Sequence, residues 1–238
     1  DHTERMLAAF GAAISIGVRE GERAVSVRPG PLSAARVEVP GDPSSAAFIA
    51  AAAAIVPGSD VLLRAVLVNP LRAGFFETLR EMGASIAFEN AREVSGEPIA
   101  DIRVKGSSLK GVAVPASRAA SMIDEYPILS VVAAFARGDT YMPGVQELRV
   151  KESDRLEAIE AGLKANGVET EAGPDWLRVF GRDGDVAGGG LTHTRADHRI
   201  AMSFLVLGLA SGKPSSIDDA SMIATSYPNF FEQMNAVG

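Results

Sequence analysis

The chain of 238 residues contains no cysteine. This absence excludes disulfides, zinc–thiolate sites and cysteine nucleophiles, and it favours a reducing compartment, so we expect a cytoplasmic protein. Aromatic residues are scarce, with a single Trp, and they form no stripe on which bases could stack. Because the formal net charge is −7, we expect binding neither to nucleic acid nor to an anionic membrane.

Long hydrophobic runs and metal-ligand spacings are also missing. The longest apolar run, Ala46 to Val56, is shorter than the roughly 20 residues that a membrane-spanning helix needs, and it predicts a buried helix. His2, His193 and His198 have no acidic partners at ligand spacing, so the sequence predicts no metal. An anionic ligand would therefore have to be held by a local group of Arg and Lys side chains.

An internal repeat organises the chain. Three times, an acidic residue precedes an Ala-rich helix that ends at a Gly, and a short strand and a second helix follow; the three stretches run from Asp42 to Gly58, Asp124 to Gly138 and Asp197 to Gly212. The first two copies continue into a pair of alternating strands. The repeated unit is β-α-β-α-β-β, which predicts an α/β fold of three units packed side by side.

The first residues do not fit this repeat. Residues 1–38 contain one helix and two strand-like runs, "AISIGVRE" and "RAVSVRP", which we interpret as the tail of another lobe. A hinge is expected near "EVPGD" at 38–42, and residues 39–238 are expected to form a lobe of three units, the last without its closing strands. The missing initiator Met suggests a piece of something longer.

Basic residues stand where helices are expected to begin. In "RVKESDRLEAIEAG", residues 149–162, Lys151 and Arg155 flank Ser153, the expected cap. The helix behind them is amphipathic, with Leu156, Ile159 and Leu163 expected to be buried and Glu160 facing Lys164. A helix N-terminus favours Asp or Glu in its first turn, so these cations are unexpected.

The third copy repeats this conflict, because His198 and Arg199 follow the expected cap Asp197. Two interpretations remain open. Arg199 pairs with a neighbouring carboxylate on a solvated face, or the helix N-termini and the cations together bind a carboxylate or phosphate. In the second copy, Asp124 is an expected cap, but Glu125 beside it is one carboxylate more than a cap requires and indicates a second role.

A family resemblance rests on five segments: "GDPSSAAF", "IDEYP", "LRVKESDRLEAIEAGLKANGV", "DHRIAMS" and "MIATSYPNF". In order and spacing they resemble the C-terminal part of the 5-enolpyruvylshikimate-3-phosphate (EPSP) synthase family, and most closely its bacterial class with glyphosate-insensitive members. The resemblance implies the enolpyruvyl transferase fold, in which each lobe is an inside-out α/β barrel of three such units and the active site lies between two lobes.

The resemblance also implies an activity. The family transfers the enolpyruvyl group of phosphoenolpyruvate to the 5-hydroxyl of shikimate 3-phosphate through a tetrahedral intermediate, without a cofactor, and glyphosate inhibits it. Carried over by position, Asp124 binds the shikimate hydroxyls and takes the proton, and Glu152 protonates and deprotonates the methylene carbon. Lys151 is implied to act in catalysis and to contact the substrates, and the other substrate contacts come from Arg155, His198 and Arg199.

Two departures limit the carry-over. Thr225 stands where many members have a Lys, and the family's N-terminal substrate-binding motifs are absent. We therefore expect activity only with an N-terminal fragment as partner. The alternative is a non-catalytic folded fragment with a vestigial anion site. The related cell-wall enolpyruvyl transferase fits less well, because it usually relies on a loop cysteine and lacks the "KESDR" string.

Overall fold

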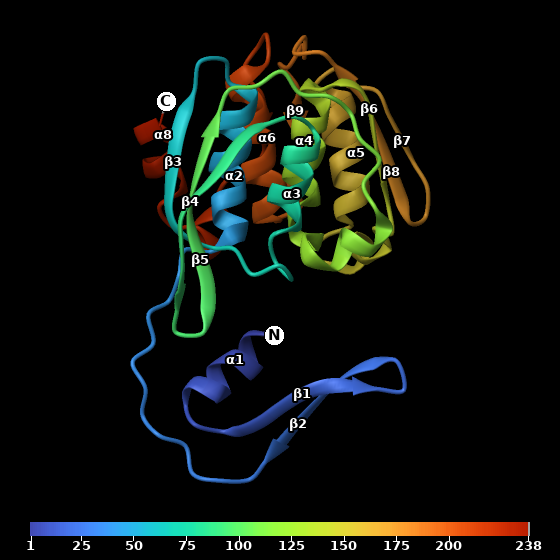
Figure 1. The fold of residues 1–238 in the computed structure, drawn as a ribbon. Coiled ribbons are helices and arrows are strands. Elements are labelled where there is room, and N and C mark those ends of the chain that lie inside the picture. The colour runs from blue at the N-terminus through green and yellow to red at the C-terminus, as the bar shows by residue number, and fades with distance from the viewer. Residues whose placement is uncertain (238) are drawn as a thin grey trace.

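The computed structural model describes residues 1–237, with side chains through Ala236. A small N-terminal part consists of α1 (His2–Ala9) and the antiparallel hairpin of β1 (Ala13–Arg19) and β2 (Glu22–Arg28). Glu20 and Gly21 both have positive φ, at 54° and 83°, as a tight two-residue hairpin turn requires. Residues 29–40 contain no helix or strand and lead to the main body (Figure 1).

Three helices form the core of the main body. They are α2 (Pro43–Ile55), α4 (Tyr126–Phe135) and α6 (His198–Ala210), one from each repeat, and they contact one another. All ten residues of α4 are buried, as are twelve of the thirteen in α2. Helices that are apolar on every face can persist only when they are enclosed, which explains the Ala-rich runs of the sequence.

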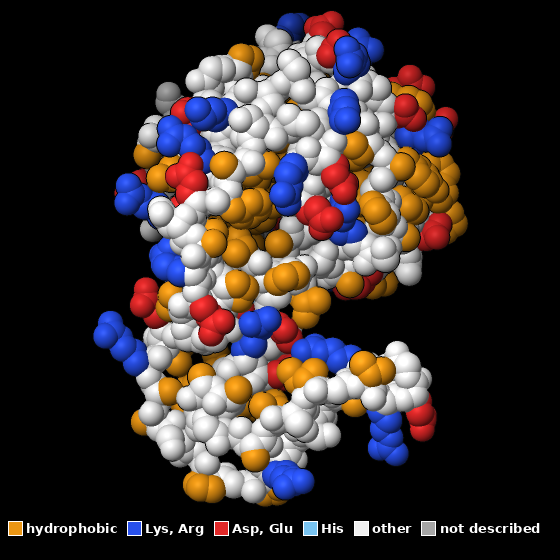
Figure 2. All heavy atoms as spheres, viewed as in Figure 1, with side chains coloured by type: hydrophobic (Ala, Val, Ile, Leu, Met, Phe, Trp, Pro, Cys, Tyr) orange, Lys and Arg blue, Asp and Glu red, His pale blue; other side chains and the backbone are white. Residues whose placement is uncertain are grey.

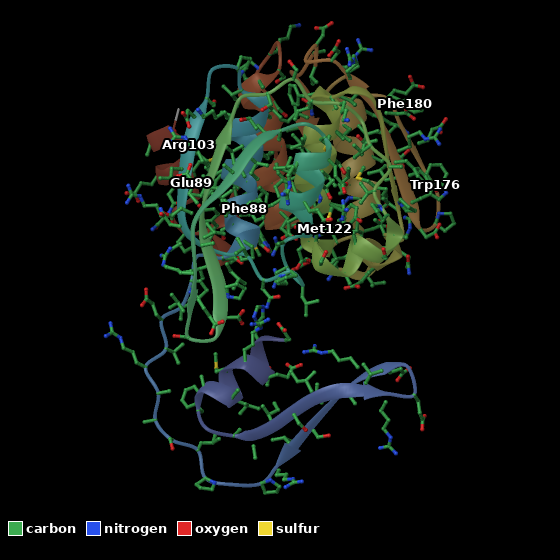
Figure 3. The ribbon with its side chains drawn as sticks, viewed as in Figure 1. Phe88, Glu89, Arg103, Met122, Trp176 and Phe180 are labelled. Carbon is green, nitrogen blue, oxygen red and sulfur yellow. The ribbon has the colours of Figure 1, made fainter. Side chains whose placement is uncertain are left out.

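Two antiparallel sheets enclose these helices. One has the order β3-β5-β4, from β3 (Asp60–Leu67), β5 (Glu97–Lys105) and β4 (Ser85–Val94), and the other has the order β6-β8-β7, from β6 (Arg137–Pro143), β8 (Trp176–Arg182) and β7 (Thr170–Ala172). Figure 3 identifies the first sheet by Phe88, Glu89 and Arg103 and the second by Trp176 and Phe180, with the helices between. The second helices of these two units are α3 (Gly74–Glu81) and α5 (Arg155–Ala165).

The first strand of each unit is reduced to a short parallel pairing. Gly41 pairs with Val66 beside α2, Lys110 and Ala113 pair with β6 beside α4, and β9 (Leu191–Thr192) pairs with β10 (Ser216–Ile217) beside α6. Each pairing joins the segment before a core helix to the strand after it, which is a parallel crossover. The predicted β-α-β-α-β-β unit is confirmed in this form.

The third unit continues as α7 (Ile223–Ser226) and α8 (Phe230–Val237), and no strand follows them in the described residues. The repeat predicted a single second helix after the short strand of this unit. Pro228 separates two helices instead, because the residue before a proline is disfavoured in helical conformation and Tyr227 accordingly has a φ of −135°. Among the helices of residues 1–237, none is both long and apolar enough to cross a membrane.

Three short 3-10 turns lie near the helix starts: Ala116–Ser121, Ile123–Glu125 and Gln146–Val150. The turn at 123–125 makes the prediction of Asp124 as the cap of α4 wrong. Glu125 occupies the cap position there, and its side chain makes no capping hydrogen bond. Asp42 does cap α2, accepting from the backbone N of Ser44 and Ser45.

Candidate functional site

The residues predicted to form a site lie together where the core helices begin. This end of the bundle faces the N-terminal part, as the starts of α2 and α4 show in Figure 1; Met122, labelled in Figure 3 and two residues before Asp124, marks it. The structure brings together the 3-10 turn before α4, the loop before α5 and the first turns of α5 and α6. These contribute Asp124, Lys151, Glu152, Arg155, Asp197, His198 and Arg199.

Arg155 is the centre of the cluster. Its side chain has no exposed surface, and its guanidinium donates to three carboxylates. Nε donates to Asp197 Oδ2 at 2.8 Å, Nη1 to Asp124 Oδ1 at 3.1 Å and Nη2 to Glu152 Oε2. A buried guanidinium requires such partners, because removing one side of a buried ion pair costs about 3–5 kcal/mol.

Asp197 links the starts of α5 and α6. Besides Arg155, it accepts from the backbone N of Arg199 at 2.9 Å and from Ser153 Oγ at 3.0 Å, so the predicted cap of α6 is confirmed. Burial alone would raise the pKa of Asp197, but the hydrogen bond and charge of Arg155 outweigh it and hold this pKa below its usual value. The carboxylate is therefore ionised at neutral pH.

The cap of α5 differs from the sequence prediction. Asp154, rather than Ser153, caps the helix by accepting from the backbone N of Glu157 at 3.0 Å, whereas the Ser153 hydroxyl turns to Asp197. Arg155 is thus the first helical residue, between two carboxylates, Asp154 and Asp197. These anions offset the unfavourable position of its charge beside the positive helix end. The predicted burial of Leu156, Ile159 and Leu163 and the pair Glu160–Lys164 are confirmed.

Asp124 faces three cations. Its oxygens lie 3.1 Å from Arg155 Nη1, 3.5 Å from Lys151 Nζ and 3.9 Å from Arg199 Nη2. Burial would raise the pKa of Asp124, but the charges of Arg199, Lys151 and Arg155 lower it overall. An ionised carboxylate that is still partly exposed can accept a proton from a ligand hydroxyl that approaches it.

Lys151 lies between Asp124 and Glu147. Its Nζ is 2.7 Å from Glu147 Oε1. Burial would lower the pKa of Lys151, but the hydrogen bond to Glu147 and the charge of Asp124 raise it overall. Lys151 is therefore a stable cation.

His198 differs from the other candidates. It is the first residue of α6, and burial, followed by the charge of Arg199, lowers its pKa below 6.5. This shift favours the neutral imidazole over a second cation beside Arg199. A neutral imidazole can still donate or accept one hydrogen bond at the edge of the site.

Glu125, expected to have a second role, joins this cluster through two residues that the sequence analysis missed, Ser44 and Arg72. The carboxylate of Glu125 accepts from Ser44 Oγ at 2.5 Å, and Ser44 Oγ also accepts from Arg72 Nη2 at 3.0 Å. Arg199 Nη1 is 3.9 Å from Glu125 Oε1. One signal pointed to Glu125, its position beside Asp124, and none pointed to Arg72, which stands in a loop without a motif.

The turn before α6 is held from two sides. Arg195 and Ala196 both have positive φ, at 55° and 57°, a conformation that costs roughly 1–3 kcal/mol for a residue other than Gly. Asp218 accepts from the backbone N and Oγ1 of Thr194, each at 2.8 Å, and Arg195 donates twice to Glu157 of α5. These contacts fix the direction in which α6 begins.

The cluster does not have the composition of a metal site. In the part of the chain that the structure describes, no group of three or more His, Asp or Glu side chains could hold an ion. The carboxylates of the cluster already face guanidinium and ammonium groups. Thr225, which stands where many family members have a Lys, is exposed, and its hydroxyl donates to the carbonyl of Met222 at 2.6 Å. Because Thr is uncharged, it does not supply the positive charge of that Lys.

Comparison with known proteins gives a consistent result. The family model described as EPSP synthase (3-phosphoshikimate 1-carboxyvinyltransferase) matches residues 1–234. Proteins named 3-phosphoshikimate 1-carboxyvinyltransferase from Roseobacter denitrificans and from Chelativorans sp. are each 58% identical over 241 residues, which cover 100% of this chain and 54% of theirs. The chain therefore spans about half the length of the curated relatives it matches.

Solved structures agree on the fold. An EPSP synthase from Acinetobacter baumannii superposes with a TM-score of 0.93 at 43% identity, over 100% of this chain and 54% of that one. The enolpyruvyl transferase NikO from Streptomyces tendae has a TM-score of 0.69 at 20% identity, over 98% of this chain and 51% of that one, and it supports the fold alone. The predicted enolpyruvyl transferase fold is confirmed.

Proposed function

Because the chain belongs to the EPSP synthase family, we propose that it is the C-terminal part of an enzyme that transfers the enolpyruvyl group of phosphoenolpyruvate to the 5-hydroxyl of shikimate 3-phosphate and releases phosphate. The observation that carries this proposal is the convergence of Lys151, Arg155 and Arg199 around Asp124. Two anionic substrates can meet only where fixed cations offset their repulsion. The reaction belongs to aromatic amino acid biosynthesis, and we expect it in the cytoplasm.

Two carboxylates divide the proton transfers. Asp124, whose pKa is held low by its three cations, takes the proton of the 5-hydroxyl as that oxygen attacks phosphoenolpyruvate. Glu152, whose side chain is 52% exposed, gives a proton to the methylene carbon to form the tetrahedral intermediate. It takes a proton back from that carbon as phosphate leaves, and Asp124 passes the proton of the 5-hydroxyl to the departing phosphate, so that both carboxyl groups return to their starting states.

The cations have unequal access to a ligand. Arg199 and Lys151 are partly exposed and can contact an anion directly, with His198 at the edge. Arg155 is buried, and its Nη2 is occupied by Glu152. In the proposal, the carboxylate of phosphoenolpyruvate replaces Glu152 at this nitrogen, which releases Glu152 for proton transfer. A guanidinium fork suits this exchange, because it binds one carboxylate as it binds another.

The remaining half of the site comes from an N-terminal partner. Residues 1–38 are proposed as the tail of the N-terminal lobe and 39–238 as the C-terminal lobe. The chain covers 54% of its relatives, and hydrophobic side chains lie open on the hairpin (Figure 2). Similarity to the bacterial class with glyphosate-insensitive members, and inhibition by glyphosate, remain predictions.

Complementation tests the proposal. The 238-residue chain alone, mixed with phosphoenolpyruvate and shikimate 3-phosphate, should release no phosphate above the uncatalysed rate. Adding the N-terminal part of a relative, such as the Roseobacter denitrificans protein, should restore release. Turnover by the chain alone would refute the need for a partner, and no turnover in a well-folded complex would refute the activity.

One observation favours the second candidate, a non-catalytic fragment with a vestigial anion site: Lys151 and Arg155 already have carboxylate partners within the chain. Calorimetric titration of the complex with phosphoenolpyruvate separates the two candidates. Arg199→Ala should weaken binding, and the exposed Arg137→Ala should not. Arg155→Ala is unsuitable, because it leaves the buried Asp197 unpaired. Equal binding by both variants would favour the vestigial site.

A further inference from the structure

The proposed reaction uses Asp124 and leaves its neighbour Glu125 without a function. Asp124 is partly exposed among the cations, whereas Glu125 has 3% of its surface exposed. Glu125 occupies the cap position of α4 but makes no capping hydrogen bond. A buried carboxylate that serves no cap is unfavourable unless other groups compensate it.

Those other groups come from two other elements. Ser44, in the first turn of α2, donates to Glu125 Oε1 at 2.5 Å, and Arg72, in the loop after β3, donates to the same Ser44 hydroxyl at 3.0 Å. Arg199, in the first turn of α6, places Nη1 3.9 Å from Glu125 Oε1 and donates from the same nitrogen to the carbonyl of Asp124 at 3.5 Å. Glu125 thus connects the starts of α2, α4 and α6.

We propose that Glu125 is a positioning residue that holds the guanidinium of Arg199, and through Ser44 that of Arg72, in place for the anionic ligand. The inference rests on the proposed function in taking phosphoenolpyruvate as that ligand. Arg199 stands between two carboxylates, Asp124 and Glu125. Without the charge of Glu125, Arg199 turns fully to Asp124. The two groups then neutralise each other, and the ligand loses the charge of Arg199.

A ligand-free measurement tests the contact itself. Glu125→Gln keeps an oxygen that can accept from Ser44 but removes the charge that faces Arg199. In a double-mutant cycle of urea unfolding with Arg199→Ala, the change in the unfolding equilibrium constant of the double variant should differ at least roughly threefold from the product of the single changes. Independent effects would overturn the proposal, whatever the chain binds.

Ligand binding tests the consequence. In the complex with the N-terminal part, the Kd for phosphoenolpyruvate should rise roughly tenfold in Glu125→Gln. The control Glu81→Gln, which removes a carboxylate that pairs with Arg118 away from the cluster, should leave the Kd unchanged. A role limited to stability would lower Tm without changing the Kd. An unchanged or lower Kd in Glu125→Gln would overturn the proposal, because the carboxylate would then only oppose the charge of Arg199.

A second variant keeps the test decisive if Glu125→Gln folds poorly. Ser44→Ala retains the carboxylate but removes the hydroxyl that holds it and accepts from Arg72. It should raise the Kd in the same direction by a smaller factor, and an unchanged Kd would contradict the proposal. If the wild-type complex binds no phosphoenolpyruvate, the proposed function fails, and the ligand-free cycle still decides whether Glu125 holds Arg199.

Discussion

At the scale of single residues, Glu152 and Arg155 share a hydrogen bond that competes with the role proposed for each. Arg155 Nη2 holds the Glu152 carboxylate, so a ligand carboxylate must displace it. Glu152 can leave because half of its side chain already meets solvent. Asp197 cannot leave, because it is fully buried and also caps α6. The exchange therefore involves only Nη2 of Arg155, the nitrogen that Glu152 occupies.

Because of this exchange, a substitution of Glu152 should change the binding of phosphoenolpyruvate and the turnover in opposite directions. In Glu152→Gln, the uncharged amide is a weaker competitor for Arg155, so phosphoenolpyruvate should bind the complex roughly fivefold more tightly. Turnover should fall roughly 10²- to 10⁴-fold, because the acid and base at the methylene carbon is lost. Calorimetry and phosphate release measure the two effects.

The matched control is Glu147→Gln, which removes a partner of Lys151 but none of Arg155. It should change turnover far less than Glu152→Gln. Weaker phosphoenolpyruvate binding in Glu152→Gln would contradict the exchange, since it would mean that the carboxylate assists the ligand.

The sequence predicted part of this cluster. Lys151, Arg155 and Arg199 stood out because cations at helix starts oppose the helix dipole, and the structure does bring them together. Ser44 and Glu125 are 81 positions apart, and no spacing pattern predicts such a contact. The full burial of Arg155 also could not be predicted, because it depends on the packing of α5 against α6.

At the scale of elements, α5 and α6 pack closely at Gly162. A Cβ added there would lie 2.3 Å from Cζ of Phe204, whose ring is fully buried. At the starts of the same two helices, reciprocal ion pairs join them as well. Arg155 of α5 pairs with Asp197 before α6, and Arg195 before α6 pairs with Glu157 of α5. The site depends on this close packing, because it brings Arg155 within reach of Asp197.

Gly162→Ala should therefore destabilise the chain although Ala is the better helix former. Overpacking against Phe204 costs about 1–3 kcal/mol, against a gain in helix propensity of about 1 kcal/mol. We expect a net loss in urea unfolding. Adding Phe204→Leu should make the cost of Gly162→Ala smaller than it is in the parent chain. Stabilisation by Gly162→Ala alone would show that the two helices can separate freely.

Helix starts were predicted to within one residue, and helix ends less closely. The helices expected to end at Gly58, Gly138 and Gly212 end at Ile55, Phe135 and Ala210, and Gly138 lies in β6. The starts depend on which of several polar residues accepts from the backbone: Asp154 caps α5 although Ser153 was equally suitable by type. Asp124 lies in a 3-10 turn and does not cap α4 as predicted, because packing rather than local propensity decides the conformation there.

At the scale of the whole molecule, the N-terminal hairpin exposes an apolar face. Ile16 pairs with Val25 and Ile14 with Val27, so these side chains share one face with Val18, which is 79% exposed. A two-stranded hairpin is marginal by itself. Figure 2 shows it projecting below the main body, with an open notch between them. In the proposed assembly, this face is the surface on which the N-terminal partner packs.

Val25→Lys should weaken assembly with the N-terminal part roughly tenfold, because a charge would enter the covered face. The Tm of the chain alone should change little, since Val25 is 46% exposed before assembly. Analytical ultracentrifugation and thermal unfolding measure the two effects. The control is Ser26→Lys on the opposite face of the hairpin. Equal assembly by both variants would contradict a role for the apolar face.

The set of carboxylates around Arg155 also limits how this sequence can vary. Positions 124, 152 and 197 lie in three separate stretches of the chain, yet they hold one guanidinium. Replacing Arg155 or Asp197 alone leaves the other as an unpaired buried charge. Replacing both with apolar residues leaves no such charge in this pair. In a mutant library, variants changed at one of these two sites should therefore be less stable than variants in which both are replaced by apolar residues, although the double variants should not bind phosphoenolpyruvate.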